Sequence, residues 1–297
     1  MSRLTAKKLD GLKKSLGSIE AALGGLEENI FAKRVFEKIF VQSRTGWGLD
    51  RKTGFADFAD FLFAHSKLSK YVLNFPGHPV TVFAWGKDFS AFEIALALGR
   101  GAYLSHFTAA YIHRLTEQVP KTIYVTVPQP AKRNSSLKLT QEDIHAAFSR
   151  PTRPTRQFAL MGKFRVARLT GMDTKGAGVV AAASPDGGQT RITSMERTLV
   201  DIVVRPNYCG GIQQVLNVFS FAKGRVSTRR IADLLKKLQY LYPYHQAVGF
   251  YMERAGYPDK EVGTMRRMGV DRDFYLAHDM RDKDYCPKWR LFFPKGF

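Results

Sequence analysis

A succession of local patterns near the amino terminus constrains the fold more than any other feature. In residues 27–43 apolar side chains recur three and four positions apart, which predicts a helix with one face in a core. Gly46, Trp47 and Gly48 interrupt this pattern, and residues 53–64 predict a second short helix. Two extended segments, 68–75 and 80–85, follow around Pro-Gly-His-Pro, which predicts a turn. Helix, turn, helix and hairpin in this order are typical of a winged helix-turn-helix.

This order predicts where the chain would contact DNA. Arg51, Lys52 and Thr53 fall at the start of the second helix, where winged helices usually contact base edges. Lys67 and Lys70 fall at the foot of the hairpin and are predicted to contact phosphates. The same helix is rich in Phe and Asp, so the alternative is that much of it packs in the core and its first residues are solvated surface.

After Gly86 the pattern changes to mixed helices and strands. We therefore predict an α+β protein with a winged helix-turn-helix domain in residues 1–87 and a larger mixed α/β domain in residues 88–297. Within the second domain the local patterns predict two helices, one strand and two loops: 90–98, 105–115 with Ser105 as N-cap, 122–127, 128–136 and 150–155.

Three helices are predicted further along the chain. Thr193 and Glu196 have the spacing of a capping box, in which the hydroxyl accepts from the Glu196 amide. Ser227 is predicted to cap the next helix, and Gly256 to end the helix of residues 246–255.

The charge balance points to a polyanionic partner. Lys and Arg number 46 against 26 Asp and Glu, for a formal net charge of +20. The hydrophobic fraction of 44% is ordinary for a globular protein and argues against disorder. Two cysteines, Cys209 and Cys286, are too few for a disulfide framework, and no apolar run approaches the ~20 residues of a membrane span. We therefore expect a cytoplasmic protein without a membrane segment, with nucleic acid as the first candidate partner.

Most of the excess charge lies beyond the predicted winged helix. Residues 144–172 and 202–232 contain no acidic side chain, and residues 163–169 alternate basic with apolar side chains, as in a strand with one cationic face. Four cations, Lys223, Arg225, Arg229 and Arg230, gather at the start of the Ser227-capped helix. Because the helix dipole disfavours cations there, we interpret this basic patch as a candidate anion site, with solvated surface as the alternative.

No motif specifies catalysis, a metal or a cofactor. His106 and His113 are seven residues apart and lack the carboxylate of a zinc-binding helix, and Cys209 has no evident histidine partner. Arg197 and Asp201 have the spacing of a helical ion pair, which their apolar neighbours predict to be half-buried. The tyrosines of residues 240–246 are interpreted as buried side chains, with a stacking surface for bases as the alternative. We therefore expect a protein that is not an enzyme.

Four segments in the second domain carry a resemblance to a known family. They are Ala102–His106, Glu196–Asp201, Arg205–Gly211 and Tyr242–Gln246. Together they resemble the antitoxin of the abortive-infection AbiE system, a type IV toxin–antitoxin family. The resemblance implies that the motif residues support the structure: Ser105, His106, Glu196, Arg197, Asp201, Gly210, Gly211, Tyr244 and His245.

The resemblance also implies a function and two partners. An antitoxin of this kind represses its own operon by binding inverted repeats in double-stranded DNA. It also counteracts a nucleotidyltransferase-like toxin encoded beside it, usually without a stable complex. Two alternatives remain open: a stand-alone winged-helix transcriptional regulator, and a nucleic-acid-processing enzyme that uses His245 and its neighbouring tyrosines.

Overall fold

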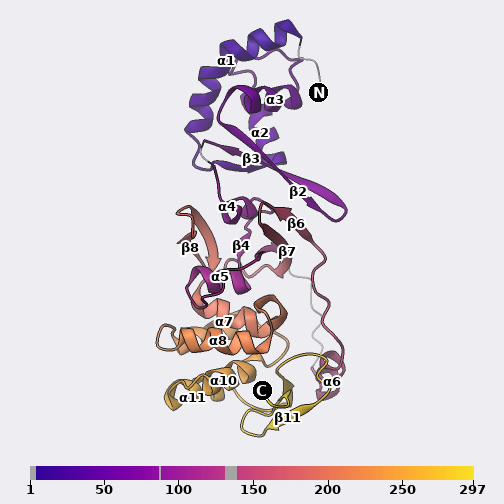
Figure 1. Ribbon diagram of the computed structural model, residues 1–297, viewed down its shortest axis with the longest axis vertical. Helices are drawn as coiled ribbons and strands as arrows, with labels where there is room; N and C mark the ends of the chain where they lie inside the picture. Colours follow the sequence, from indigo (N-terminus) through magenta and orange to yellow (C-terminus); the bar gives the residue numbers. More distant parts are fainter. Residues whose placement is uncertain (1–4, 87, 131–138) are drawn as a thin grey trace.

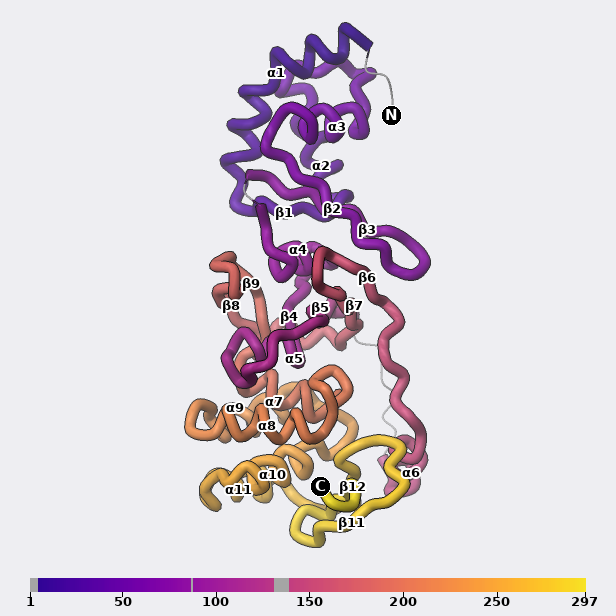
Figure 2. Tube along the Cα trace, viewed as in Figure 1, coloured from indigo at the N-terminus to yellow at the C-terminus, as the bar shows by residue number. Residues whose placement is uncertain are grey.

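The computed structural model describes residues 5–86, 88–130 and 139–297 of the chain. The elements stack along one long axis (Figures 1 and 2). A small sheet with three helices lies at one end, a six-stranded sheet in the middle, and a group of helices with a second small sheet at the other end. The protein is therefore of the α+β class, as predicted.

The amino-terminal region alternates helices and strands. Its strands form an antiparallel sheet in the order β1-β3-β2. The elements are α1 (Ala6–Gly24), β1 (Ile30–Ala32), α2 (Lys33–Ser43), α3 (Phe55–His65), β2 (Leu68–Phe75) and β3 (His78–Trp85). The prediction of one helix over residues 27–43 is wrong at its start, because Ile30–Ala32 pairs with β3 and only the rest is helical.

Aromatic side chains form the core of this region. The Phe36 ring of α2 lies 5.0 Å from that of Phe83 in β3 and 5.9 Å from that of Phe58 in α3. Leu12, Ile19 and Leu23 of α1 are fully buried against the same cluster. The apolar stripes of the sequence therefore hold the three helices on the small sheet.

The β2–β3 hairpin extends from this region toward the middle layer. Its turn is Pro76-Gly77, and Gly77 adopts a φ of 94°, a conformation that favours glycine. Leu73 and Phe75 of the hairpin are buried in the cluster that also contains the residues of the six-stranded sheet. The far half of the hairpin therefore packs on the middle layer, beside β6 (Phe158–Met161) (Figure 1).

The middle layer is a mixed sheet with the strand order β6-β7-β5-β4-β9-β8. β5 pairs with β7 and β4 with β9 in parallel, and the other pairs are antiparallel. The remaining elements are α4 (Ala91–Leu96), β4 (Tyr103–Leu104), α5 (His106–Ile112), β5 (Thr122–Gln129), β7 (Phe164–Met172), β8 (Val179–Ala183) and β9 (Gln189–Thr193). The helix of residues 90–98 and the strand of 122–127 are thus confirmed, and residues 131–136 of the predicted loop lie outside the described residues.

The interpretation of residues 163–169 as a strand with one cationic face is wrong in part. A strand is present, but Val166 and Ala167 are consecutive residues and both are fully buried, so its two faces are covered. Of the three cations in residues 163–169, Lys163 and Arg165 are exposed, while Arg168 is half-buried. The cause is the central place of β7 between β5 and β6.

Helices and a small sheet complete the chain. They are α7 (Met195–Val204), the short 3-10 helix η1 (Pro206–Cys209), α8 (Ile212–Ala222), α9 (Thr228–Leu238), α10 (Tyr244–Arg254), α11 (Asp259–Arg266), β10 (Phe274–Tyr275), β11 (Lys283–Cys286) and β12 (Leu291–Pro294). The excursion between β5 and β6 carries α6 (Gln141–Phe148) to this end of the molecule (Figure 1). There the Gln141 amide exchanges two hydrogen bonds with the backbone of Asp273.

Of the four predicted helix caps, those at Ser227 and Gly256 occur and those at Ser105 and Thr193 do not. The Ser227 hydroxyl accepts a hydrogen bond from the Arg230 amide, and Gly256 adopts a φ of 73° after α10. The capping box at Thr193 and Glu196 is wrong: Ser194 caps α7 by accepting from the Arg197 amide. The Thr193 hydroxyl instead bonds that of Thr198 in the buried interior, 2.7 Å away. Because Thr193 packs in the interior, the cap of α7 is Ser194, one residue after the predicted position.

Candidate functional site

The predicted DNA-contacting residues lie at two places on the amino-terminal region. Arg51 and Lys52 are exposed, but they belong to the turn that precedes α3 rather than to the helix. Thr53 is only 2% exposed, so its side chain cannot reach a DNA groove and that prediction is wrong. Lys67 and Lys70 are exposed at the foot of the hairpin.

The solvent face of α3 carries no cation. Ala56, Asp60 and Phe63 are exposed on it, and Phe63 is 58% exposed. Asp57 is buried and accepts a hydrogen bond from the Lys8 ammonium at 2.7 Å. Any phosphate contacts of this region therefore come from the turn before α3 and from the hairpin foot.

The basic patch at the start of α9 is partly used for contacts within the chain. The Arg225 guanidinium donates to the backbone carbonyls of Arg114 and His113, at 2.9 and 2.8 Å. Arg230 lies 3.9 Å from Glu196, a long ion pair. Lys223 and Arg229 are exposed. The four cations therefore do not all face a common free site, because Arg225 is engaged.

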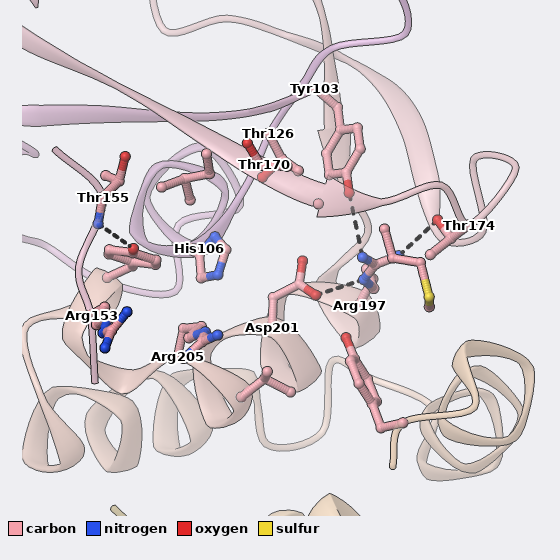
Figure 3. Close-up of a pocket in the computed structure, with 16 residues that line it drawn as sticks. Tyr103, His106, Thr126, Arg153, Thr155, Thr170, Thr174, Arg197, Asp201 and Arg205 are labelled. Carbon is pink, nitrogen blue, oxygen red and sulfur yellow. Dashed lines mark hydrogen bonds and ion pairs between the residues drawn. The ribbon is translucent and has the colours of Figure 1, made fainter. Parts of the chain in front are cut away.

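Residues from three of the four family-like segments converge on one cavity in the middle of the molecule (Figure 3). It has a volume of about 400 Å³ and lies at the carboxyl ends of the parallel strands β5 and β7, which contribute Thr126 and the stretch 169–172. In open sheets this is the edge at which ligands usually bind. Tyr103 and His106 enter from the first segment. The α7 and η1 segments add Arg197, Asp201, Arg205 and Tyr208.

Arg197 and Asp201 form the buried wall of this cavity. The Arg197 Nε atom lies 2.7 Å from Asp201 Oδ1, and both side chains are less than a tenth exposed. Arg197 also donates to the Ala177 carbonyl at 2.7 Å, while Thr174 and the Tyr103 hydroxyl lie 3.5 Å from its guanidinium. Burial disfavours the charged guanidinium, but the field of Asp201 outweighs it and raises the pKa of Arg197. The predicted ion pair is confirmed, and it is more deeply buried than expected.

His106 lies at the floor of the cavity in an unusual backbone conformation. Its φ of 52° is in the left-handed region, which non-glycine residues adopt mainly where the surroundings impose it. Its Nδ1 atom is hydrogen-bonded to the Ser105 hydroxyl at 2.8 Å, and that hydroxyl is bonded to Thr126 at 2.7 Å. Ser105 thus occupies the predicted N-cap position, but its side chain does not cap the helix.

The protonation state of His106 follows from its surroundings. Burial lowers the pKa of His106 to about 4, and the positive charges of Arg197 and Arg205 act in the same direction against the field of Asp201. The imidazole is therefore neutral at neutral pH. Its Nε2 atom has no hydrogen-bond partner within the described part of the chain.

Tyrosines form the remaining walls. Tyr208 stands edge-on to the His106 ring, with ring centres 5.3 Å apart, and its hydroxyl accepts a hydrogen bond from the Thr155 amide at 2.9 Å. Tyr240 also lines the cavity, close enough for the charge of Asp201 to act on its phenol. Burial raises the pKa values of Tyr103 and Tyr240, so both phenols stay protonated. The walls therefore combine aromatic surface with hydroxyl groups.

Two arginines at the mouth lack partners. Arg153, from the loop before β6, and Arg205, at the end of α7, line the cavity and are exposed. Neither guanidinium makes a hydrogen bond or an ion pair with any residue in the ranges 5–86, 88–130 and 139–297. Sequence reasoning missed Arg153 as a site residue, although it lies in an acid-free stretch, because nothing local connects it to a pocket.

The other motif residues have structural positions outside this cavity. Gly210 and Gly211 adopt φ angles of 90° and 99° and make the turn from η1 into α8. Tyr244 is 8% exposed, in the core of the helical end. Glu196 is buried and accepts a hydrogen bond from the Ser227 amide. His245 Nε2 lies 2.6 Å from the Gly269 carbonyl, to which it donates.

The residues around His245 and the state of Cys209 bear on the enzyme alternative. The shallow cavity beside His245 is lined by Tyr240, Tyr242, Tyr244 and Arg272 but by no carboxylate. Cys209 is buried, and burial raises its pKa to about 12, so it is not a ready nucleophile. No group of three or more His, Cys, Asp or Glu side chains with the spacing of a metal site occurs among the described residues. Nor does any helix described here have the length and apolar character needed to span a membrane.

Comparison with known proteins shows a shared fold and no more. No protein-family model matches the chain, and no curated protein matches it. The crystal structure of the RV2827C protein from Mycobacterium tuberculosis is similar over 94% of this chain and 91% of its own length, with a TM-score of 0.53 and 15% identity. The arrangement of helices and sheets described above is therefore shared with a solved protein over nearly the whole chain.

Proposed function

We propose that this protein is a cytoplasmic antitoxin of a type IV, AbiE-like toxin–antitoxin system that represses its own operon. The observation that carries the proposal is the topology of the amino-terminal region. Helix, strand, two helices and a two-stranded hairpin, with the sheet order β1-β3-β2, support a winged helix at this end of the chain. Its partners would be operator DNA with inverted repeats and a nucleotidyltransferase-like toxin.

The proposed DNA contacts are mainly electrostatic. Arg51 and Lys52 in the turn before α3, and Lys67 and Lys70 at the hairpin foot, are exposed and suited to phosphate oxygens. Asp60 on the solvent face of α3 would repel phosphates, so the helix itself contributes few base contacts. Sequence selectivity would then come largely from DNA shape and from few base edges.

DNA binding is tested with the full chain and a labelled duplex of the DNA upstream of its own coding sequence. We expect binding that competes with unrelated DNA and weakens steeply with salt. The double variant Arg51→Ala with Lys52→Ala should bind less tightly. The matched control, Lys236→Ala with Lys237→Ala, removes two exposed cations from the end of α9 and should bind as the parent does. Equal affinity for promoter and unrelated DNA contradicts the autorepressor.

The antitoxin role needs a separate experiment. Co-expression with a nucleotidyltransferase-like gene from the same operon should restore growth that the gene alone arrests. The variants that lose operator binding should still restore growth when both genes are driven from foreign promoters. The reason is that we propose the second domain, residues 88–297, as the part that neutralises the toxin. Promoter binding without rescue would favour the stand-alone transcriptional regulator.

A further inference from the structure

The cavity at the carboxyl ends of β5 and β7 presents positive charge that no described residue balances. Three guanidinium groups and one carboxylate line it, and the buried pair Arg197–Asp201 uses one of each. Arg153 and Arg205 remain at the mouth with all their donors free among the described residues. Planar guanidinium groups bind phosphate oxygens in pairs of parallel hydrogen bonds. The mouth is therefore suited to a phosphate group.

The floor of the same cavity offers acceptors. Asp201 accepts from Arg197 through Oδ1, whereas its second oxygen has no partner in the described chain. The neutral His106 ring likewise has an unpartnered nitrogen. A second anionic group placed here would be repelled by Asp201. A ligand that fills the cavity must therefore be anionic at one end and carry hydroxyl or amino hydrogens at the other.

The walls between mouth and floor are aromatic and held in place. Tyr208 is fixed by its hydrogen bond to Thr155 and by the edge-on contact with His106. The hydrogen-bond chain of His106, Ser105 and Thr126 and the strained backbone at His106 hold the floor. Strained backbone conformations held by the surrounding structure are concentrated at binding sites. A volume of about 400 Å³ falls in the range of small-ligand pockets.

We propose that this cavity binds a nucleoside phosphate. The phosphate lies on Arg153 and Arg205, the base lies along Tyr208, and a ribose hydroxyl or base amine donates to the free oxygen of Asp201. A free nucleotide and the phosphorylated end of a nucleic-acid strand share this chemistry. The site is separate from the winged-helix region, so it does not depend on the proposed operator binding.

The first arm of the test measures binding of adenosine, guanosine, cytidine and uridine 5′-monophosphates to the full chain by calorimetry. The same measurement with the four nucleosides and with inorganic phosphate shows how much the nucleoside and the phosphate group each contribute to nucleotide affinity. We expect at least one nucleotide to bind about tenfold or more tightly than its nucleoside and than phosphate. The nucleoside lacks the contacts with Arg153 and Arg205, and phosphate lacks the contacts with Tyr208 and Asp201.

The second arm uses variants at the mouth. Arg153→Ala with Arg205→Ala should weaken nucleotide binding about tenfold or more and leave the melting temperature unchanged, because both side chains are exposed. The matched control is Arg156→Ala with Arg281→Ala. Arg156 lies in the same loop as Arg153, and both control residues are exposed but do not line the cavity. The control should bind nucleotide as the parent does.

The source of the ligand is identified with short oligonucleotides. A 5′-phosphorylated trinucleotide that binds more tightly than the mononucleotide, and loses affinity when its phosphate is removed, assigns the cavity to a strand end. Equal or weaker binding assigns it to free nucleotides. The proposal is overturned if no nucleotide or phosphorylated trinucleotide binds at millimolar concentration, or if the mouth variant and the control bind equally. Promoter binding is measured on the same samples. Neither outcome of the nucleotide experiment bears on it, so the two proposals can fail separately.

Discussion

Two ion pairs with the same helical spacing occupy opposite environments in this molecule. In α1 the Lys14 ammonium lies 2.8 Å from Asp10, and the two side chains are 76% and 62% exposed. In α7 the Arg197 Nε atom lies 2.7 Å from Asp201, and the side chains are 6% and 7% exposed. Sequence spacing and distance are nearly the same, whereas the exposure of the side chains and the order of acid and base along the helix differ. Water screens the first pair, whereas the second stands in a medium of low polarity where an unpaired charge is costly.

The same contrast separates the two regions that we assign to binding. The cations assigned to DNA contact, Arg51, Lys52, Lys67 and Lys70, are exposed at the surface, as suits contacts with a phosphate backbone. Around α7, charged and polar groups from several segments meet in one cavity and fix one another. The first arrangement provides affinity that depends on salt; the second provides a shaped site.

The largest effect is expected from Asp201→Ala. It leaves the Arg197 guanidinium buried without a counter-ion, which should lower the free energy of unfolding by about 3–5 kcal/mol. Asp10→Ala, the matched change in the exposed pair, should have no measurable effect. Urea denaturation of both variants checks this. Similar losses in the two variants would mean that burial does not distinguish the pairs.

The pH dependence of the unfolding free energy should distinguish the interior of the cavity from the surface. The unfolded chain has a His106 pKa near 6.5, while burial lowers it to about 4 in the folded protein. Between these values the unfolded chain binds more protons than the folded protein does. The contribution of His106 to stability is therefore complete above pH 6.5 and is lost as the pH falls. At pH 5 the loss should be about 2 kcal/mol.

The variant His106→Gln isolates this contribution. The fall in unfolding free energy from pH 7.5 to pH 5 should be smaller in the variant by that amount, since His113, His245 and His278 titrate in both proteins. Parallel pH profiles for parent and variant would contradict a neutral, buried His106.

At the surface, the contribution of charge should be visible in the salt dependence of promoter binding. Lys67→Ala with Lys70→Ala removes two exposed cations at the hairpin foot and should weaken promoter binding roughly tenfold at low salt. The slope of log affinity against log salt should become shallower by about 2. Fluorescence anisotropy over a salt series measures both quantities. An unchanged slope would remove the hairpin foot from the DNA interface.

The smallest effect concerns helix caps. Ser194 accepts from the Arg197 amide at the start of α7, so Ser194→Ala should lower the unfolding free energy by about 1 kcal/mol, and Ser194→Asp should retain the cap. Thr5 occupies the same position before α1 but makes no capping hydrogen bond, so Thr5→Ala should not change stability. Thermal unfolding of the three variants tests whether the cap geometry or the residue type matters.

Local sequence signals predicted the elements with strong local patterns. Apolar periodicity predicted α3 and most of α2, Pro-Gly-His-Pro marked the turn between β2 and β3, and Ser227 and Gly256 marked the ends of helices correctly. Errors arose where contacts distant in sequence decide the local structure. Ile30–Ala32 pairs with β3, and the Ser194 amide at the start of α7 donates to the Gly178 carbonyl.

The sequence by itself determined that Arg197 and Asp201 would pair, because positions four apart on a helix always face one another. It also determined the excess of positive charge. Only the tertiary structure decided which charges matter to a binding site. Bringing Arg153, His106 and Tyr208 to one cavity requires β5, β7, α7 and η1 to pack together. Burial, which distinguishes this ion pair from that of α1, is a property of that packing and not of local spacing.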